Sequence, residues 1–151
     1  MDAANRLNPV FPATVLALLW ATVAAIAQTP SAEQSPLQQA MVPKLTGGEE
    51  VPEVNTPAYG RSTIVVSADR SVSGDVETTD IKGTMAHIHQ GAAGSNGPVV
   101  VTLIKRSETL WSVPAGTILT AEQYQSFQAG KLYVNVHSAA HPGGQIRLQL
   151  H

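Results

Sequence analysis

Cysteine is absent from this chain of 151 residues, and charged residues make up only 13% of it. Without cysteine no disulfide can form, so a folded domain must be held together by its core, by a metal ion or by both. The same absence excludes thiolate metal sites. Histidine, carboxylate, methionine and water remain as ligands.

Basic residues are few and form no cluster, and nine Lys and Arg stand against eleven Asp and Glu. The net charge of −2 argues against nucleic acid as a partner. The chain also lacks a Gly-x-Ser-x-Gly, P-loop or dinucleotide-binding motif. No catalytic residue is therefore assigned, and the sequence favours a function without turnover.

A largely apolar run covers residues 10–27, with Arg6 ahead of it and the small-x-small pattern Ala25-Ile26-Ala27 at its end. We interpret residues 1–27 as a signal peptide, so the mature protein begins near Gln28 and is secreted or periplasmic. A leader that stays uncleaved would instead anchor the protein to a membrane. The run is short for a span, which needs about 20 apolar residues.

Residues 28–41 are polar and rich in Pro, Ser and Gln, which is typical of a flexible linker. The single domain then covers 42–151, where apolar and polar residues mostly alternate between turn signals. A strong strand over 61–68 is predicted to turn at Asp69-Arg70 and to return over 71–78. Further strands are expected over 42–45, 83–89, 99–104, 108–113, 131–137 and 145–150.

The β-branched run at 99–104 predicts a strand that is buried on both faces. Thr120 and Gln123 form a capping box ahead of one short helix over 121–128, which ends at Gly130. About eight short strands and one helix predict an all-β fold, an antiparallel, Greek-key-like sandwich or barrel.

Four of the five histidines lie in two segments: His87 and His89 in one expected strand, His137 in another and His141 in the turn after it. Side chains alternate along a strand, so His87 and His89 share the polar face. Their spacing of roughly 6.5–7 Å allows two imidazoles to converge on one ion at about 2.0 Å. We predict a metal site of His87, His89 and His137, with His141 or Met85 as a fourth ligand.

An all-nitrogen site with an open position suits Cu(II) or Zn(II), and the affinity order favours copper over zinc. A structural cluster is the alternative. In that interpretation His87 and His89 are hydrogen-bonded and orient the glycine-rich turn over 91–97, while His141 only shapes the hairpin before Pro142. Glu49, Glu50 and Glu53 are interpreted as a solvated edge of the first loop.

Six motifs follow one another along the chain: Leu45-Thr46-Gly47-Gly48-Glu49-Glu50-Val51-Pro52, Gly60, Ala86-His87-Ile88-His89-Gln90-Gly91, Gly97-Pro98-Val99, Leu132-Tyr133-Val134-Asn135-Val136-His137-Ser138 and Pro142-Gly143-Gly144-Gln145-Ile146-Arg147. In this order they resemble the CHRD domain, the module that is repeated in chordin and also occurs singly in exported bacterial proteins. The resemblance covers about 42–150. Gln145, where the family usually has Glu, and Leu148, where Gly is common, depart from it.

The His-x-His strand and the late Val-x-Val-His are also similar to the copper-site strands of copper/zinc superoxide dismutase. That similarity implies copper ligands at His87, His89 and His137, and an anion guide at Arg147. The bridging histidine, the zinc-site Asp and the disulfide have no evident equivalents, so it adds weight to metal binding rather than to dismutase activity.

The leading hypothesis is therefore an exported CHRD-domain protein that holds or traffics a transition metal, copper before zinc. The second is a metal-free extracytoplasmic module that engages a protein or a glycan. The third is a copper redox enzyme of the superoxide dismutase type.

Overall fold

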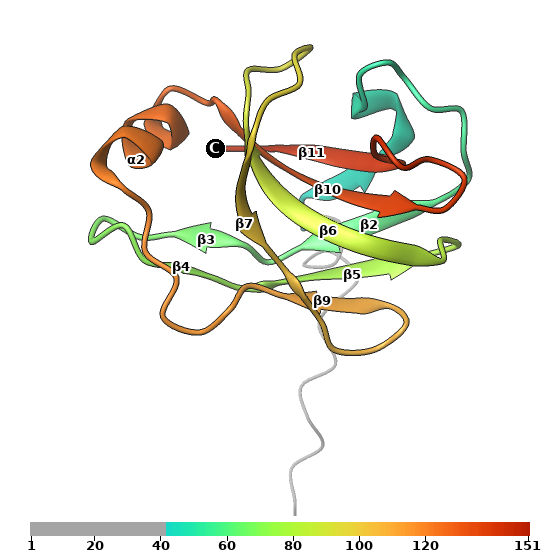
Figure 1. Cartoon of the computed structure of the whole chain (residues 1–151), viewed down its shortest axis with the longest axis horizontal. Coiled ribbons are helices and arrows are strands. Elements are labelled where there is room, and N and C mark those ends of the chain that lie inside the picture. The colour runs from blue at the N-terminus through green and yellow to red at the C-terminus, as the bar shows by residue number, and fades with distance from the viewer. Residues whose placement is uncertain (1–41) are drawn as a thin grey trace, which may run out of the picture. The chain divides into compact units, whose positions relative to one another are not determined.

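The computed structural model describes residues 42–151 (Figure 1). The predicted signal peptide, 1–27, and linker, 28–41, lie outside the described residues. Among the residues that are described, no helix has the length and apolar character needed to cross a membrane.

The described part of the chain contains eleven strands, one 3₁₀ helix and one α-helix. They are β1 (Lys44–Thr46), η1 (Gly47–Glu49), β2 (Tyr59–Ser62), β3 (Val65–Val66), β4 (Val72–Ser73), β5 (Asp75–Thr79), β6 (Gly83–Gln90), β7 (Val99–Thr102), β8 (Ile104–Lys105), β9 (Leu110–Ser112), α2 (Ala121–Gln128), β10 (Leu132–Ser138) and β11 (Ile146–Leu150).

Nine of these strands form one sheet, in the order β7-β6-β10-β11-β1-β2-β5-β9-β8, and every pairing in it is antiparallel. The edge strands β7 and β8 follow each other in the chain with only Leu103 between them. The sheet therefore curls into a near-barrel, with β6 and β10 lying over β5 and β9 in Figure 1. The predicted all-β sandwich or barrel is confirmed.

The apolar core lies inside this curled sheet, and alternation along the strands places its members there. In β10 the alternate residues Leu132, Val134 and Val136 are all fully buried. Other residues of the core come from strands on both sides of the barrel: Leu45, Val76, Ala86, Ile88, Trp111 and Ile146.

Two of the expected long strands are broken in the structure, at Thr63 and at Gly74. The first break separates β2 from β3, and the second separates β4 from β5. β3 and β4 pair with each other as a separate two-stranded ribbon. Gly74 has φ +114°, and a Cβ on it would lie 2.3 Å from the Thr63 carbonyl oxygen. Only glycine permits this close approach of the two backbones, and both strands are interrupted where they meet, at Thr63 and Gly74. The predicted hairpin at Asp69-Arg70 is confirmed as the tip of the ribbon.

The prediction that 99–104 is a strand buried on both faces is wrong. The run is divided into the two edge strands, and Val99 and Ile104 are 51% and 40% exposed. Leu103, between the edges, is buried and donates its N–H to the Ala86 carbonyl. An apolar run does not show whether a strand lies in the middle of a sheet or at its edge. The sequence therefore did not reveal that β7 and β8 are edge strands, which are partly exposed.

The predicted helix is confirmed as α2, with the same bounds. Gln123 donates its backbone N–H to Thr120 Oγ1 at 3.1 Å, and the Thr120 N–H donates to Gln123 Oε1 at 2.9 Å. No residue of α2 is fully buried, so the helix lies against the barrel without building its core.

The glycine at the strand break yields a stability prediction. Gly74→Ala should lower the free energy of unfolding by about 1–3 kcal/mol, because alanine is strained at this φ and its Cβ meets a backbone oxygen. Gly143→Ala is the matched control, since a Cβ there has nothing within 4 Å. Urea unfolding followed by circular dichroism measures both. Equal stability of the two variants would contradict the role of Gly74.

Candidate metal centre

The strands that carry the three histidines are direct neighbours. In the antiparallel pairing of β6 with β10, Asn135 lies opposite His87, Tyr133 opposite His89, and His137 opposite Met85. All of these side chains point away from the core, so His137 is diagonal to His87 on one face. Irregular pairing occurs beside two of the histidines, between His137 and Ser138 and between Ile88 and His89. Bulges of this kind often re-aim side chains at sites.

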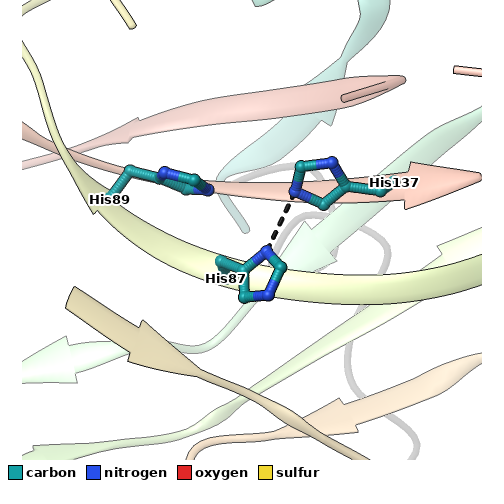
Figure 2. Close-up of side chains that lie close together, drawn as sticks. All are labelled: His87, His89 and His137. Atoms are coloured by element: carbon teal, nitrogen blue, oxygen red, sulfur yellow. Dashed lines mark hydrogen bonds between the residues drawn. The ribbon is translucent and has the colours of Figure 1, made fainter. Parts of the chain in front are cut away.

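The side chains of His87, His89 and His137 converge, as Figure 2 shows. His87 Nδ1 lies 3.0 Å from His137 Nε2. The ring of His89 is centred 5.4 Å from that of His87 and 6.0 Å from that of His137. One nitrogen from each residue can be chosen so that all three lie within 4.8 Å of one another. The structure thus brings together three of the four predicted ligands.

Backbone carbonyls orient two of the three rings. His89 Nδ1 lies 2.9 Å from the Gly97 oxygen, and His137 Nδ1 lies 2.9 Å from the Pro142 oxygen. A carbonyl only accepts, so we infer that each Nδ1 carries the hydrogen and that each Nε2 has a lone pair. The lone pair of His137 Nε2 accepts from His87 Nδ1. The Nε2 atom of His89 is buried and has no hydrogen-bond partner. Metal-ligating histidines are held by this kind of second contact.

Burial favours the neutral form of His87 and His137. Burial, together with the neighbouring His137 and His89, lowers the pKa of His87 to about 4. Burial also lowers the pKa of His137, and this outweighs the opposing effect of its bond to Pro142. Neutral imidazoles at physiological pH can bind a metal without first losing a proton.

The other predicted ligand, His141, is not part of this group. It lies in the turn between β10 and β11, where its backbone N–H is 3.2 Å from Ser138 Oγ and its carbonyl accepts from Gly144. Its role as a ligand stays a prediction. The carbonyls of Gly97 and Pro142 were not predicted, because a backbone contact leaves no signature in residue type.

The polar face that carries the histidines is covered, although the sequence predicts only that it points away from the core. Every residue of β10 is buried. Arg147, in β11, is 1% exposed and donates to the Ala92 and Ser95 carbonyls of the glycine-rich loop, both at 3.1 Å. It therefore fastens that loop over the sheet, and the anion-guide role that the dismutase likeness implied does not fit its burial.

A stack of side chains connects Arg147 to the cluster. The Arg147 guanidinium lies 3.4 Å from the centre of the Tyr133 ring. The ring of His89 is also stacked on Tyr133, with the ring centres 4.9 Å apart and the planes 4° apart. Tyr133 also accepts the Gly97 N–H through its hydroxyl, so His89 and Tyr133 hold the same glycine. This packing limits how far the His89 ring can turn.

The interpretation of Glu50 as part of a solvated edge is wrong, since Glu50 is 5% exposed. Burial raises its pKa to about 7, although the Arg147 charge and a hydrogen bond with Asn135 act in the opposite direction. Gly144, with φ +131°, lies against it, and a Cβ there would be 2.5 Å from Glu50 Oε1. The acidic cluster in the sequence gave no sign of this, because the β10–β11 turn that covers Glu50 is remote in the chain.

The domain that carries the cluster matches a known family. The model of the CHRD domain matches residues 42–150. The chain belongs to the CHRD-domain family. No curated protein and no solved structure matches it. The match spans both histidine strands and the loops that cover them, so the cluster is an integral part of this CHRD domain.

The buried carboxyl predicts a pH dependence of stability. The folded pKa of Glu50, about 7, lies above its ordinary value of 4.5, so the folded state binds more protons between these values. Its contribution to stability is present below pH 4.5 and is lost as the pH rises through 7. From pH 5 to 8 the loss should be on the order of 2 kcal/mol.

Urea unfolding of the wild type and of Glu50→Gln at pH 5 and pH 8 tests this. The variant should lack the loss, whereas Glu53→Gln, at an exposed position, should retain it. All three proteins keep the same histidines, so the difference between their pH profiles reports on the substituted carboxyl. Parallel pH profiles for wild type and Glu50→Gln would contradict the assignment.

Proposed function

We propose that this CHRD-domain protein binds one transition metal ion, copper before zinc, through His87, His89 and His137. Its role is to hold or traffic the metal without turnover. The observation that supports the proposal best is the buried, unpartnered Nε2 of His89, which faces two further imidazoles. An unsatisfied buried nitrogen costs free energy unless something binds it, and a metal ion does so.

The donor set supports the choice of metal. The three-residue group contains imidazoles and no carboxylate, which suits copper or zinc better than magnesium or calcium. Nitrogens bound to one ion at about 2.0 Å lie roughly 3–3.5 Å apart. His87 Nδ1 and His137 Nε2 already have that separation, at 3.0 Å. Closing the set then needs His89 to move closer and His87 to carry its proton on Nε2 in place of Nδ1.

Holding rather than turnover is supported by how the ligands are fixed. His89 and His137 are 8% and 6% exposed, and each is tied to a backbone carbonyl, while His87 is half-buried. An ion would thus enter past His87 and reach two ligands that are already oriented. Oriented ligands lower the entropic cost of binding.

A metal-free module is the second candidate, and one observation favours it. The 3.0 Å contact between His87 and His137, together with the two carbonyl contacts, gives every ring a partner without any ion. The cluster would then fasten the glycine-rich loop and the β10–β11 turn. The domain would engage a protein or a glycan through its surface.

Titration with copper and zinc separates the two candidates. We expect one Cu(II) per chain by calorimetry, with nitrogen hyperfine structure in the EPR spectrum. His87→Ala/His89→Ala should lose this binding, because two of three ligands are removed, and His151→Ala, at the exposed end of the chain, should keep it.

Circular dichroism of each variant shows whether the fold survives, and His87→Gln tests the half-buried ligand alone. A folded wild type that binds neither metal would sink the metal hypothesis and leave the interaction module.

We also propose that the protein works outside the cytoplasm, on the basis of the apolar run over 10–27. Expression in a Gram-negative host followed by fractionation and intact-mass measurement tests this. The periplasmic protein should lack residues 1–27. A full-length mass in the membrane fraction would indicate a retained anchor, and one in the cytoplasm would overturn export.

A further inference from the structure

Met85 holds the only sulfur atom of residues 42–151, because the chain has no cysteine and its other two methionines are Met1 and Met41. Its side chain is 47% exposed, although methionine is normally used to fill the core. It lies in β6, two residues before His87, so it shares a face with both histidines of that strand. A large apolar side chain is thus left in solvent next to the candidate site.

The register of the sheet places Met85 directly beside a ligand. It is the cross-strand partner of His137, and the irregular pairing begins just beyond that pair. Cross-strand partners have Cβ atoms about 4.5–5.5 Å apart, and methionine has three rotatable bonds with which to span such a gap. Thr84 Oγ1 donates a hydrogen bond to the His137 carbonyl oxygen at 3.3 Å, which links β6 and β10 beside this pair.

Exposure decides which side of the cluster is open. His89 and His137 are buried, whereas His87 is half-buried and Met85 is exposed. The approach from solvent therefore passes His87 and Met85, and a fourth ligand has to come from that side. His141 lies in the turn beyond β10 and outside the group.

Given a metal at the three histidines, as proposed above, we propose that Met85 supplies a fourth, thioether ligand when the ion is Cu(I). A thioether is soft and neutral, and it favours Cu(I), whereas imidazole binds both oxidation states. Three nitrogens retain Cu(II) without the thioether. The site therefore holds copper in either oxidation state. Cu(I) and Cu(II) each bind as they are supplied, and the proposal involves no electron transfer at the site.

The test uses the full chain with Met85→Leu, which keeps the size and apolar character but removes the sulfur. Anaerobic competition with a chromogenic Cu(I) chelator should show an affinity for Cu(I) that is at least about tenfold weaker, the loss that even an outer-sphere change brings. The Cu(II) affinity and EPR spectrum should stay those of the wild type. Val65→Ala, at an exposed position on the separate ribbon, is the control and should change neither.

X-ray absorption of the Cu(I) forms gives an independent readout. The wild type should show a sulfur neighbour that Met85→Leu lacks, while a contribution from Met1 or Met41 would persist in the variant. Equal Cu(I) affinities, or a sulfur signal that survives in Met85→Leu, would overturn the role of Met85 and leave the three-histidine site intact. A wild type that binds copper in neither state would overturn the proposed function itself, and this inference with it.

Discussion

The antiparallel pairing of β6 with β10 in a single register determines where the chemistry of this domain is located. It buries Ala86, Ile88, Val134 and Val136 on one face and brings the histidines together on the other. A slip of one residue would exchange the faces, placing imidazoles in the apolar core. The core therefore specifies the geometry of the histidine cluster, because the register that buries the apolar residues is also the one that aligns the ligands.

The outer face of β10 is a second, polar interior. Arg147, Tyr133 and His89 stack on one another and hold the glycine-rich loop, while Glu50 is covered by the turn that contains Gly144. Burying such groups is costly, and hydrogen bonds to loop carbonyls offset the cost for Arg147. The loops are thus positioned by the same layer that orients the histidines, so loop order and site geometry are coupled.

Sequence reasoning succeeded where local patterns decide structure. The capping box at Thr120 and Gln123 defined α2, and side-chain alternation placed His87 and His89 together on one face of β6. It failed where contacts between distant segments decide. The strand over 61–68 is broken because Gly74 approaches Thr63, and Val99 is exposed because its strand lies at an edge. Glu50 is buried by a turn about ninety positions further along the chain.

By itself the sequence determined the all-β class, the short helix, and which histidines share a face with which neighbours, because side-chain alternation and capping are local. Only the tertiary structure decided that β6 lies beside β10, that three histidines and not four form the group, and that Gly97 and Pro142 orient two of them. Pairing partners, loop cover and backbone contacts depend on the closure of the whole sheet. Hydrophobic burial selects that closure across the entire chain, so no single segment encodes it.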